Sequence, residues 1–175
     1  MMSGDVPPVT TPPKRISHEA ELLAHLRVVA DGLGIECVTG QGSSNRFGID
    51  GWGLSGLQQF QFGDLRIELP TTSVLVETES AGGVGNLVKY WPLLRTGGRE
   101  RRLVLIHLYM LASDGDYIAH RKLWSFLVDR MDTDLRSVGV HRPDDWDAHL
   151  FTYRKGSPPD DVVAFLRATV AGEPG

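Results

Sequence analysis

The stretch Asp64-Leu-Arg-Ile-Glu-Leu-Pro-Thr-Thr-Ser-Val-Leu-Val-Glu-Thr-Glu79 decides the fold that we expect for this chain. Apolar and polar residues alternate over residues 65–69 and again over residues 74–79, and this period of two predicts two β-strands. Pro70-Thr71-Thr72 predicts the turn between them, since proline cannot donate a hydrogen bond to a sheet but suits a turn. The stretch therefore indicates a β-hairpin.

The pairing of these two strands carries a prediction about charge. In an antiparallel hairpin, the numbers of paired residues have a constant sum, and directly opposed side chains lie on the same face. Burial of the apolar residues of both strands on one face requires that sum to be odd, because a slip by one residue would turn one strand over. An odd sum also puts Asp64 on the face of Glu77 and Glu79. We therefore expect three carboxylates to share one patch.

Such a patch needs a compensating proton or cation. Two like charges about 4 Å apart repel by roughly 1 kcal/mol in water and by several times more near a protein interior. Oxygen-rich clusters suit Mg²⁺ or Mn²⁺, which retain water and often bind phosphate as well. The alternative is that Glu77 and Glu79 lie on a solvent-exposed face of the sheet, where alternating polar residues are ordinary.

The order of residues around this hairpin resembles the PD-(D/E)XK nuclease superfamily. Asp64 matches the aspartate of the motif and Glu77 its glutamate, whereas Glu79 stands where the usual lysine would be. Asn86-Leu-Val-Lys-Tyr90 is similar to the Gln-x-x-x-Tyr motif of the following helix, with Asn in place of Gln. This resemblance implies a restriction-endonuclease-like fold with an αβββαβ core, and it covers about a third of the chain.

The resemblance also implies a metal-dependent active site. Mg²⁺ or Mn²⁺ would be held by the carboxylates of Asp64 and Glu77 and by the carbonyl of Thr78, with Glu79 either adding a ligand or orienting the attacking water. Lys89 either reaches back to supply the charge of the missing lysine or faces solvent.

Other residues are candidates for contact with a nucleic acid. The resemblance gives Asn86 and Tyr90 this role. Arg99, Arg101 and Arg102 belong to the most basic segment of the chain, which indicates either phosphate binding or a solvated loop.

Two further segments carry open alternatives. Residues 39–56 form a long loop in which Arg46, Phe47 and Trp52 either grip a nucleic-acid strand or anchor the loop to the core. Near the N-terminus, Glu19 and Glu21 either compensate the dipole of a helix capped by Ser17 or add a ligand to the metal.

The rest of the pattern predicts one domain over residues 17–171. A helix is expected from Ser17 to Gly34, a central strand over the apolar run 103–111, an amphipathic helix over 117–131, an edge strand over 149–153 and a last helix from Ser157. Together with the hairpin, this order fits an α/β three-layer sandwich with a central mixed β-sheet. Residues 1–16 are rich in proline and are expected to form a disordered N-terminal segment.

Composition narrows the choice of function. A formal net charge of -4 argues against a surface that binds nucleic acid all over, although a local basic groove is compatible with it. The single cysteine excludes an intrachain disulfide framework. No apolar run reaches transmembrane length and no signal-type core is present, so we expect a cytoplasmic protein without a membrane partner.

Three classes of function follow from these observations. The first is a Mg²⁺- or Mn²⁺-dependent nuclease that hydrolyses phosphodiester bonds of DNA, or of RNA. The second is a catalytically degraded nuclease-fold module that binds nucleic acid or a protein partner, and the third is a small-molecule enzyme that uses the acidic patch. A homodimer or a larger complex is compatible with each.

Overall fold

A computed structural model describes residues 17–40, 45–79, 84–96, 101–111, 118–139, 145–154 and 156–174. The N-terminal segment 1–16, for which the sequence predicts disorder, and Arg99 lie outside these residues. Within them, no helix combines the length and the apolar character needed to cross a membrane.

The main sheet is mixed and has five strands. In spatial order they are β1 (Cys37–Thr39), β4 (Leu65–Glu68), β5 (Thr72–Glu79), β6 (Arg102–Met110) and β7 (Trp146–Tyr153). The pairs β1–β4 and β4–β5 are antiparallel, whereas β5–β6 and β6–β7 are parallel. The hairpin, the central strand and the edge strand predicted from the sequence are thus all confirmed.

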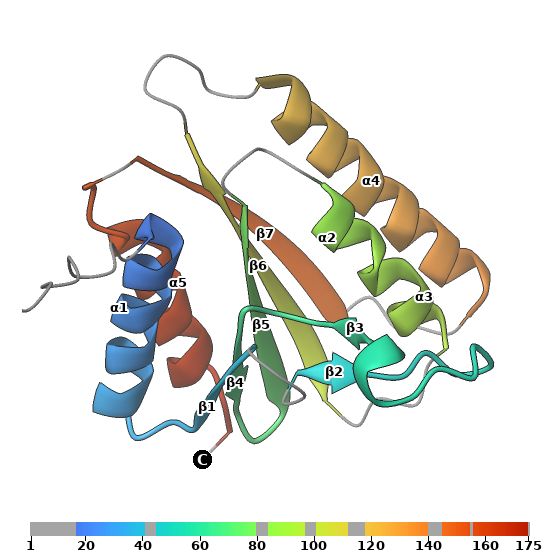
Figure 1. Ribbon diagram of the computed structural model, residues 1–175, viewed down its shortest axis with the longest axis horizontal. Coiled ribbons are helices and arrows are strands. Elements are labelled where there is room, and N and C mark those ends of the chain that lie inside the picture. The colour runs from blue at the N-terminus through green and yellow to red at the C-terminus, as the bar shows by residue number, and fades with distance from the viewer. Residues whose placement is uncertain are drawn as a thin grey trace, which may run out of the picture.

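Helices cover both faces of this sheet (Figure 1). One face carries α1 (His18–Gly32) and α5 (Asp160–Ala171), and the other carries α2 (Gly85–Val88), α3 (Tyr90–Arg95) and α4 (Ile118–Ser137). Ser17 caps α1 as predicted, because its Oγ accepts a hydrogen bond from the backbone N–H of Ala20 at 3.2 Å. The described residues therefore form an α/β fold with a central mixed sheet between two layers of helices.

Each face of the sheet has its own apolar core. Leu65 lies opposite Val76 in the hairpin register, so the sum of paired numbers is odd, as the alternation predicted. Val74 and Val76 pack with the residues of α1 and α5, and Leu75 packs on the other side among residues of α2, α3 and α4. Because helices cover both faces of the sheet, the face of β5 that carries Glu77 is also buried. The alternative in which Glu77 lies on a solvent-exposed face is therefore wrong.

Two segments near the hairpin form short elements. Residues 57–62 contribute only the two-residue strand β3 (Phe60–Gln61), which follows a 3₁₀ turn η1 (Gly56–Gln58) and pairs with β2 (Arg46–Phe47) outside the main sheet. The helical segment after β5 is divided at Lys89, where α2 ends and α3 begins.

Candidate functional site

The candidate site lies at the carboxyl end of β5. Glu77 and Glu79 are two residues apart on that strand and therefore face the same side, toward α2 and α3. Asp64 immediately precedes β4 and extends the hairpin ladder, because its N–H donates to the carbonyl of Val76 at 2.7 Å. The sequence prediction that these three residues meet at one end of the hairpin is thus correct for the backbone.

Glu77 is buried and held by three donors on one oxygen. Its side chain is 2 % exposed, and Oε1 accepts from the Lys89 Nζ at 2.7 Å, the Tyr90 hydroxyl at 2.5 Å and the Gly63 N–H at 2.7 Å. Gly63 can present that N–H because it adopts a φ of 78°, which other residues rarely take. Burial raises the pKa of Glu77, and the neighbouring charge of Lys89 opposes that rise.

Lys89 links the two glutamates through Asn86. The Lys89 ammonium also donates to Asn86 Oδ1 at 3.2 Å, and Asn86 Nδ2 donates to Glu79 Oε1 at 2.7 Å. Burial raises the pKa of Glu79 despite this hydrogen bond, and the charges of Glu77 and Asp64 raise it further. The sequence alternative in which Lys89 reaches back to the carboxylates is therefore the one found.

Asp64 is oriented differently from the two glutamates. Its Oδ2 accepts hydrogen bonds from the N–H and the hydroxyl of Thr78, at 2.8 and 2.7 Å, and its Oδ1 accepts a weak one from Gln61 at 3.4 Å. In an extended strand the N–H and C=O of one residue leave on the same side, so the Thr78 carbonyl leaves β5 on the side where Asp64 lies. The side chain of Asp64 thus lies at the edge of β5, beside Thr78.

This orientation changes the prediction of a shared patch. The described residues contain no group of three or more His, Cys, Asp or Glu side chains that could hold a metal ion. Glu77 in particular does not suit a metal ligand, because its Oε1 already receives an ammonium, a hydroxyl and an N–H in a buried position. The preassembled set of Asp64, Glu77 and Glu79 that the sequence predicted is not present.

Two carboxylates of the site remain outside the Lys89 ion pair. Asp64 and Glu79 have no ion-pair partner among the described residues, and the charge of Asp64 contributes to raising the pKa of Glu79. Mg²⁺ commonly uses one or two carboxylates and completes its shell with water and substrate phosphates. Asp64, Glu79 and the Thr78 carbonyl are the oxygens that fit such a site, without Glu77.

A cavity opens beside Asp64. It has a volume of about 400 Å³ and lies between α1 and the edge of the sheet, where Arg27 and Gln61 also line it. Asp64 is therefore accessible from the α1 side, whereas Glu77 is enclosed by α2 and α3. A ligand that contacts Asp64 can approach through this opening.

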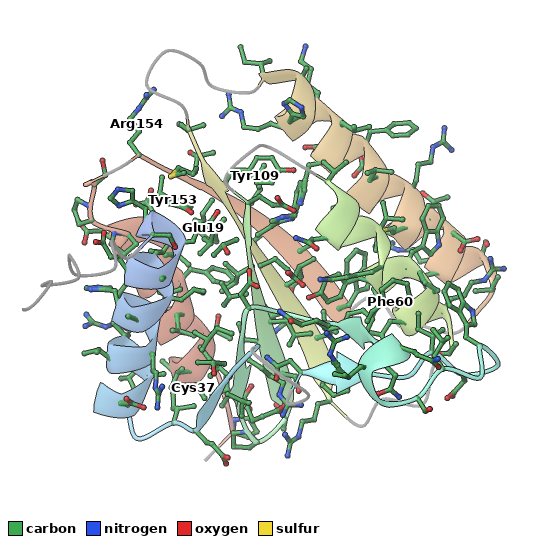
Figure 2. All side chains as sticks on the ribbon, in the orientation of Figure 1. Glu19, Cys37, Phe60, Tyr109, Tyr153 and Arg154 are labelled. Atoms are coloured by element: carbon green, nitrogen blue, oxygen red, sulfur yellow. The ribbon has the colours of Figure 1, made fainter. Side chains whose placement is uncertain are left out.

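The neighbouring parallel strands end in tyrosines. Figure 2 shows Tyr109 and Tyr153 at the ends of β6 and β7, with Glu19 of α1 beside Tyr153. Burial raises the pKa of each tyrosine to about 12, helped by the charge of Glu79 at Tyr109 and by the charges of Glu19 and Asp64 at Tyr153. Both phenols are therefore neutral at ordinary pH.

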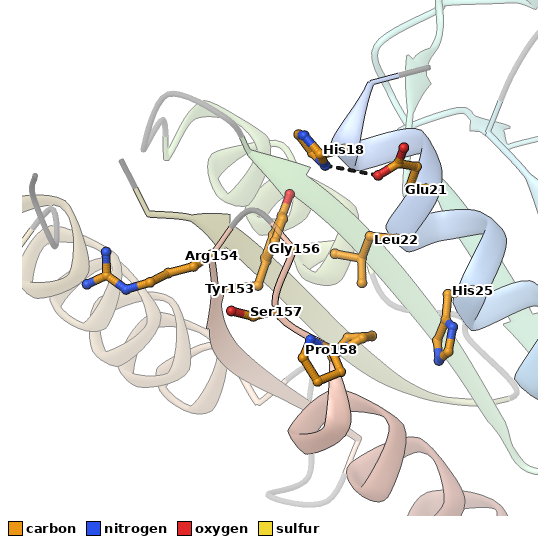
Figure 3. A pocket seen from close by; sticks show the side chains of 10 residues that line it. His18, Glu21, Leu22, His25, Tyr153, Arg154, Gly156, Ser157 and Pro158 are labelled. Carbon is orange, nitrogen blue, oxygen red and sulfur yellow. Dashed lines mark ion pairs between the residues drawn. The ribbon is translucent and has the colours of Figure 1, made fainter. Parts of the chain in front are cut away.

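A second cavity adjoins this end of the sheet (Figure 3). It has a volume of about 290 Å³, and His18, His25 and Tyr153 are among its lining residues. Glu21 pairs with His18 at 3.0 Å across the first turn of α1, so its carboxylate is engaged away from Asp64. The charge of Glu19 contributes to the raised pKa of Tyr153.

The predicted basic residues lie at the opposite end of the sheet. Arg102 is in register with Thr72, the first residue of β5, whereas Glu79 is the last, so roughly 23 Å of strand separates them at about 3.3 Å per residue. Arg102 pairs with Asp147 at 2.5 Å and Arg101 with Glu68 at 2.6 Å. The structure thus places Arg101 and Arg102 far from the carboxylates, and Tyr90, predicted to contact nucleic acid, is fully buried.

Sequence reasoning missed two contributors to the site. Gly63 supplies the N–H that binds Glu77, and Thr78, predicted only for its carbonyl, donates two hydrogen bonds to Asp64. A Gly directly before the first acid and a Thr between two glutamates are the only sequence signals of these contacts.

Comparison of the chain with protein families, with curated proteins and with solved structures finds no match.

Proposed function

We propose that this protein is a metal-dependent nuclease of the PD-(D/E)XK type, which hydrolyses phosphodiester bonds of DNA or RNA. The observation that carries the proposal is the pairing of Asp64 with Thr78 at the end of β5, next to the Glu79–Asn86–Lys89 network. The element order α1, β1, β4, β5, α2–α3, β6 supports it, since this is the αβββαβ order expected for that superfamily.

The protein's own groups have distinct tasks in this proposal. Asp64, the Thr78 carbonyl and Glu79 would hold Mg²⁺ or Mn²⁺, which supplies charge stabilisation for the phosphate. In the alternative role that the resemblance gives it, Glu79 would orient the attacking water. Lys89 provides the positive charge that the usual motif lysine would bring, from a helix rather than from the strand.

Glu77 acts as a positioning residue. Its three hydrogen bonds tie Gly63 before β4, Lys89 and Tyr90 of the helical segment, and β5 into one unit. Because Lys89 then reaches Asn86 and Asn86 reaches Glu79, the orientation of Glu79 depends on Glu77. This arrangement separates the motif glutamate from metal binding and gives it a supporting role.

A second candidate is a nuclease-fold module that binds nucleic acid or a protein partner without hydrolysing it. The observation in its favour is the internal pairing of Glu77 with Lys89, which neutralises one carboxylate without any metal. Under this alternative Asp64 and Glu79 have no catalytic role, and their replacement leaves every measured function intact.

A cleavage assay separates the two. We expect the protein to cleave oligonucleotides with Mg²⁺ or Mn²⁺, and we expect Asp64→Asn and Glu79→Gln each to reduce the rate by roughly a hundredfold or more, in line with the loss of one electrostatic group from an active site. Glu68→Gln is the matched control, because Glu68 is a half-buried carboxylate on β4 at the other end of the hairpin. Cleavage that survives both site substitutions, or no cleavage with either metal, would contradict the nuclease proposal.

A further inference from the structure

The strand β7 forms one open edge of the main sheet. Among the described strands it pairs with β6 on one side and with no strand on the other. It is eight residues long and contains neither proline nor lysine, the residues with which proteins commonly protect such an edge. A long edge strand without these residues is suited to pair with a further strand.

Two hydrogen bonds show which residues of β7 face the open edge. The carbonyl of Tyr153 accepts from the N–H of Leu111 at 2.8 Å, so Tyr153 directs its backbone N–H and C=O toward β6. The carbonyl of residue 145 does the same at the other end of the strand, where it accepts from the N–H of residue 103 at 2.9 Å. Since successive residues of an extended strand alternate in this direction, Ala148, Leu150 and Thr152 direct their N–H and C=O groups to the open edge.

A shallow apolar hollow adjoins this edge on the side of α4. It has a volume of about 600 Å³, and Leu150 of β7 and Ile118, Ser125 and Phe126 of α4 are among its lining residues. Phe126 is 52 % exposed, although the guanidinium of Arg130 lies 5.3 Å from the centre of its ring. Exposed apolar surface of this kind, next to an open edge, is typical of a protein–protein interface.

Two charges of opposite sign flank the centre of the hollow. Lys122 and Asp129 both line it, both are exposed, and neither forms an ion pair within the described residues. They lie two helical turns apart and therefore on the same side of α4, with Ser125 and Phe126 midway between them. When a second copy of α4 runs antiparallel to the first about this midpoint, each Lys122 meets the Asp129 of the other copy. The charge pattern is thus complementary to itself.

One two-fold axis can cover the edge and the hollow together. Two copies of a strand that pair antiparallel are related by such an axis, and the interface closes at two chains. Leu150 is the middle one of the three outward-directed residues, and it lines the hollow together with Ser125 and Phe126. Directly opposed residues of paired strands lie on the same face, so pairing Leu150 with its own copy places both α4 helices on one side of the joined sheet.

We propose that the open edge of β7 and the adjoining side of α4 bind a second copy of this chain, as a two-fold symmetric dimer whose sheet continues through both copies. A second copy fits better than an unrelated extended peptide, because a peptide strand would satisfy only the edge and would leave Lys122 and Asp129 unmatched. The proposal does not depend on the nuclease proposal, since none of these residues belongs to the site at Asp64 and Glu79.

Sedimentation velocity of the full-length chain tests the charge pattern. We expect the parent to approach twice the mass of one chain across roughly 1–100 µM, with no larger species. Lys122→Glu and Asp129→Lys should each weaken dimerisation by roughly tenfold, because two ion pairs per dimer become repulsive. The double variant Lys122→Glu/Asp129→Lys should restore dimerisation, because the reversed charges again match themselves.

Thr152→Pro tests the strand edge separately. It removes an outward-directed N–H at a position where proline is tolerated, because β6 does not use that N–H. We expect loss of the dimer and an unchanged far-ultraviolet circular dichroism spectrum. In the parent, amide hydrogen exchange at Ala148, Leu150 and Thr152 should slow as the protein concentration rises, and this measurement requires no substitution.

The matched control is Asp31→Lys. It makes the same change of charge as Asp129→Lys at an exposed position of α1, which covers the opposite face of the sheet (Figure 1), so dimerisation should be unchanged. A parent that stays monomeric, or that forms species larger than a dimer, would overturn the proposal. Dimerisation that persists in Lys122→Glu and Asp129→Lys, a double variant that does not recover, or amide exchange at Leu150 that is independent of concentration would overturn it as well.

Discussion

The two ends of the central sheet use the same kinds of charged residues in opposite ways. At the amino end of β5 and β6, Glu68 forms ion pairs with Arg66 at 3.2 Å and with Arg101 at 2.6 Å, and Arg102 pairs with Asp147. These side chains are all partly exposed to solvent. Among the described residues, the acids and bases of this end therefore satisfy one another at the surface.

At the carboxyl end the balance is different. One cation, Lys89, is nearly buried and pairs with Glu77, which leaves Asp64 and Glu79 to repel each other without an ion-pair partner in the described part of the chain. Exposed ion pairs contribute little to stability, whereas a buried charge without a partner is costly. The comparison shows that exposed ion pairs neutralise the amino end, whereas two carboxylates at the carboxyl end have no ion pair within the described residues.

Among substitutions of charged residues at the two ends of the sheet, removal of Lys89 should cause the largest loss of stability. We expect Lys89→Met to lower the free energy of unfolding by about 3–5 kcal/mol, because it leaves the buried Glu77 carboxylate without its cation. Urea unfolding measures this. The double variant Lys89→Met/Glu77→Gln should recover much of the loss, since the amide can still accept from Gly63 and Tyr90. A loss below 1 kcal/mol for Lys89→Met would show that the pair is not buried in solution.

A second effect of the carboxyl end should appear in the dependence of protein stability on pH. His107 is buried beside Glu77 in the β5–β6 register and accepts a hydrogen bond on Nδ1 from the Trp124 indole at 3.0 Å. Burial lowers its pKa to about 3, and the charge of Lys89 adds to that effect. Since the unfolded chain takes up a proton near pH 6.5 and the folded one does not, stability is complete above pH 6.5 and is lost as the pH falls toward 3.

The size of this acid effect is measurable. Between pH 7 and pH 5 we expect His107 to contribute about 2 kcal/mol of lost stability, from roughly 1.4 kcal/mol for each pH unit below 6.5. His107→Gln should remove that part of the pH dependence in urea unfolding, whereas His25→Gln on the exposed side of α1 should leave it unchanged. An identical pH profile for the parent and His107→Gln would contradict a neutral, buried His107.

The smallest effect is expected at the amino end. Arg102→Ala removes an ion pair whose two side chains are 45 % and 33 % exposed, so we expect a loss below about 1 kcal/mol that shrinks as salt is added. We also expect no change in oligonucleotide binding or cleavage, because Arg102 lies at the far end of β5 from Glu79. A large decrease in oligonucleotide binding would show that this end of the sheet belongs to the functional surface.

The fold was predictable largely because burial enforces it. The alternation in the hairpin sets its parity, the apolar run of β6 identifies a covered strand, and Ser17 marks the start of α1. The pairing of residues 57–62 was not predictable from alternation, since those residues join a small separate sheet with β2. The alternation of apolar and polar residues does not indicate which strand a short strand pairs with.

The sequence predicts the location of the site better than it predicts the orientation of its side chains. Alternation assigns a residue to a face, but the carboxylate of Asp64 turns to two donors of Thr78 at the end of the ladder. The separation of Arg101 and Arg102 from the carboxylates could have been predicted from the topology. A crossover between parallel strands returns the chain to their amino end, away from the residues that close β5.

Mn²⁺ binding tests the central contrast most directly. Electron paramagnetic resonance can count the Mn²⁺ bound per chain in the presence of a phosphorothioate oligonucleotide, which supplies phosphate ligands but resists cleavage. We expect one bound ion that is lost in the Asp64→Asn/Glu79→Gln double variant and retained in Glu68→Gln. A parent chain that binds no ion, or a double variant that binds it as tightly as the parent does, would contradict a metal site at Asp64 and Glu79.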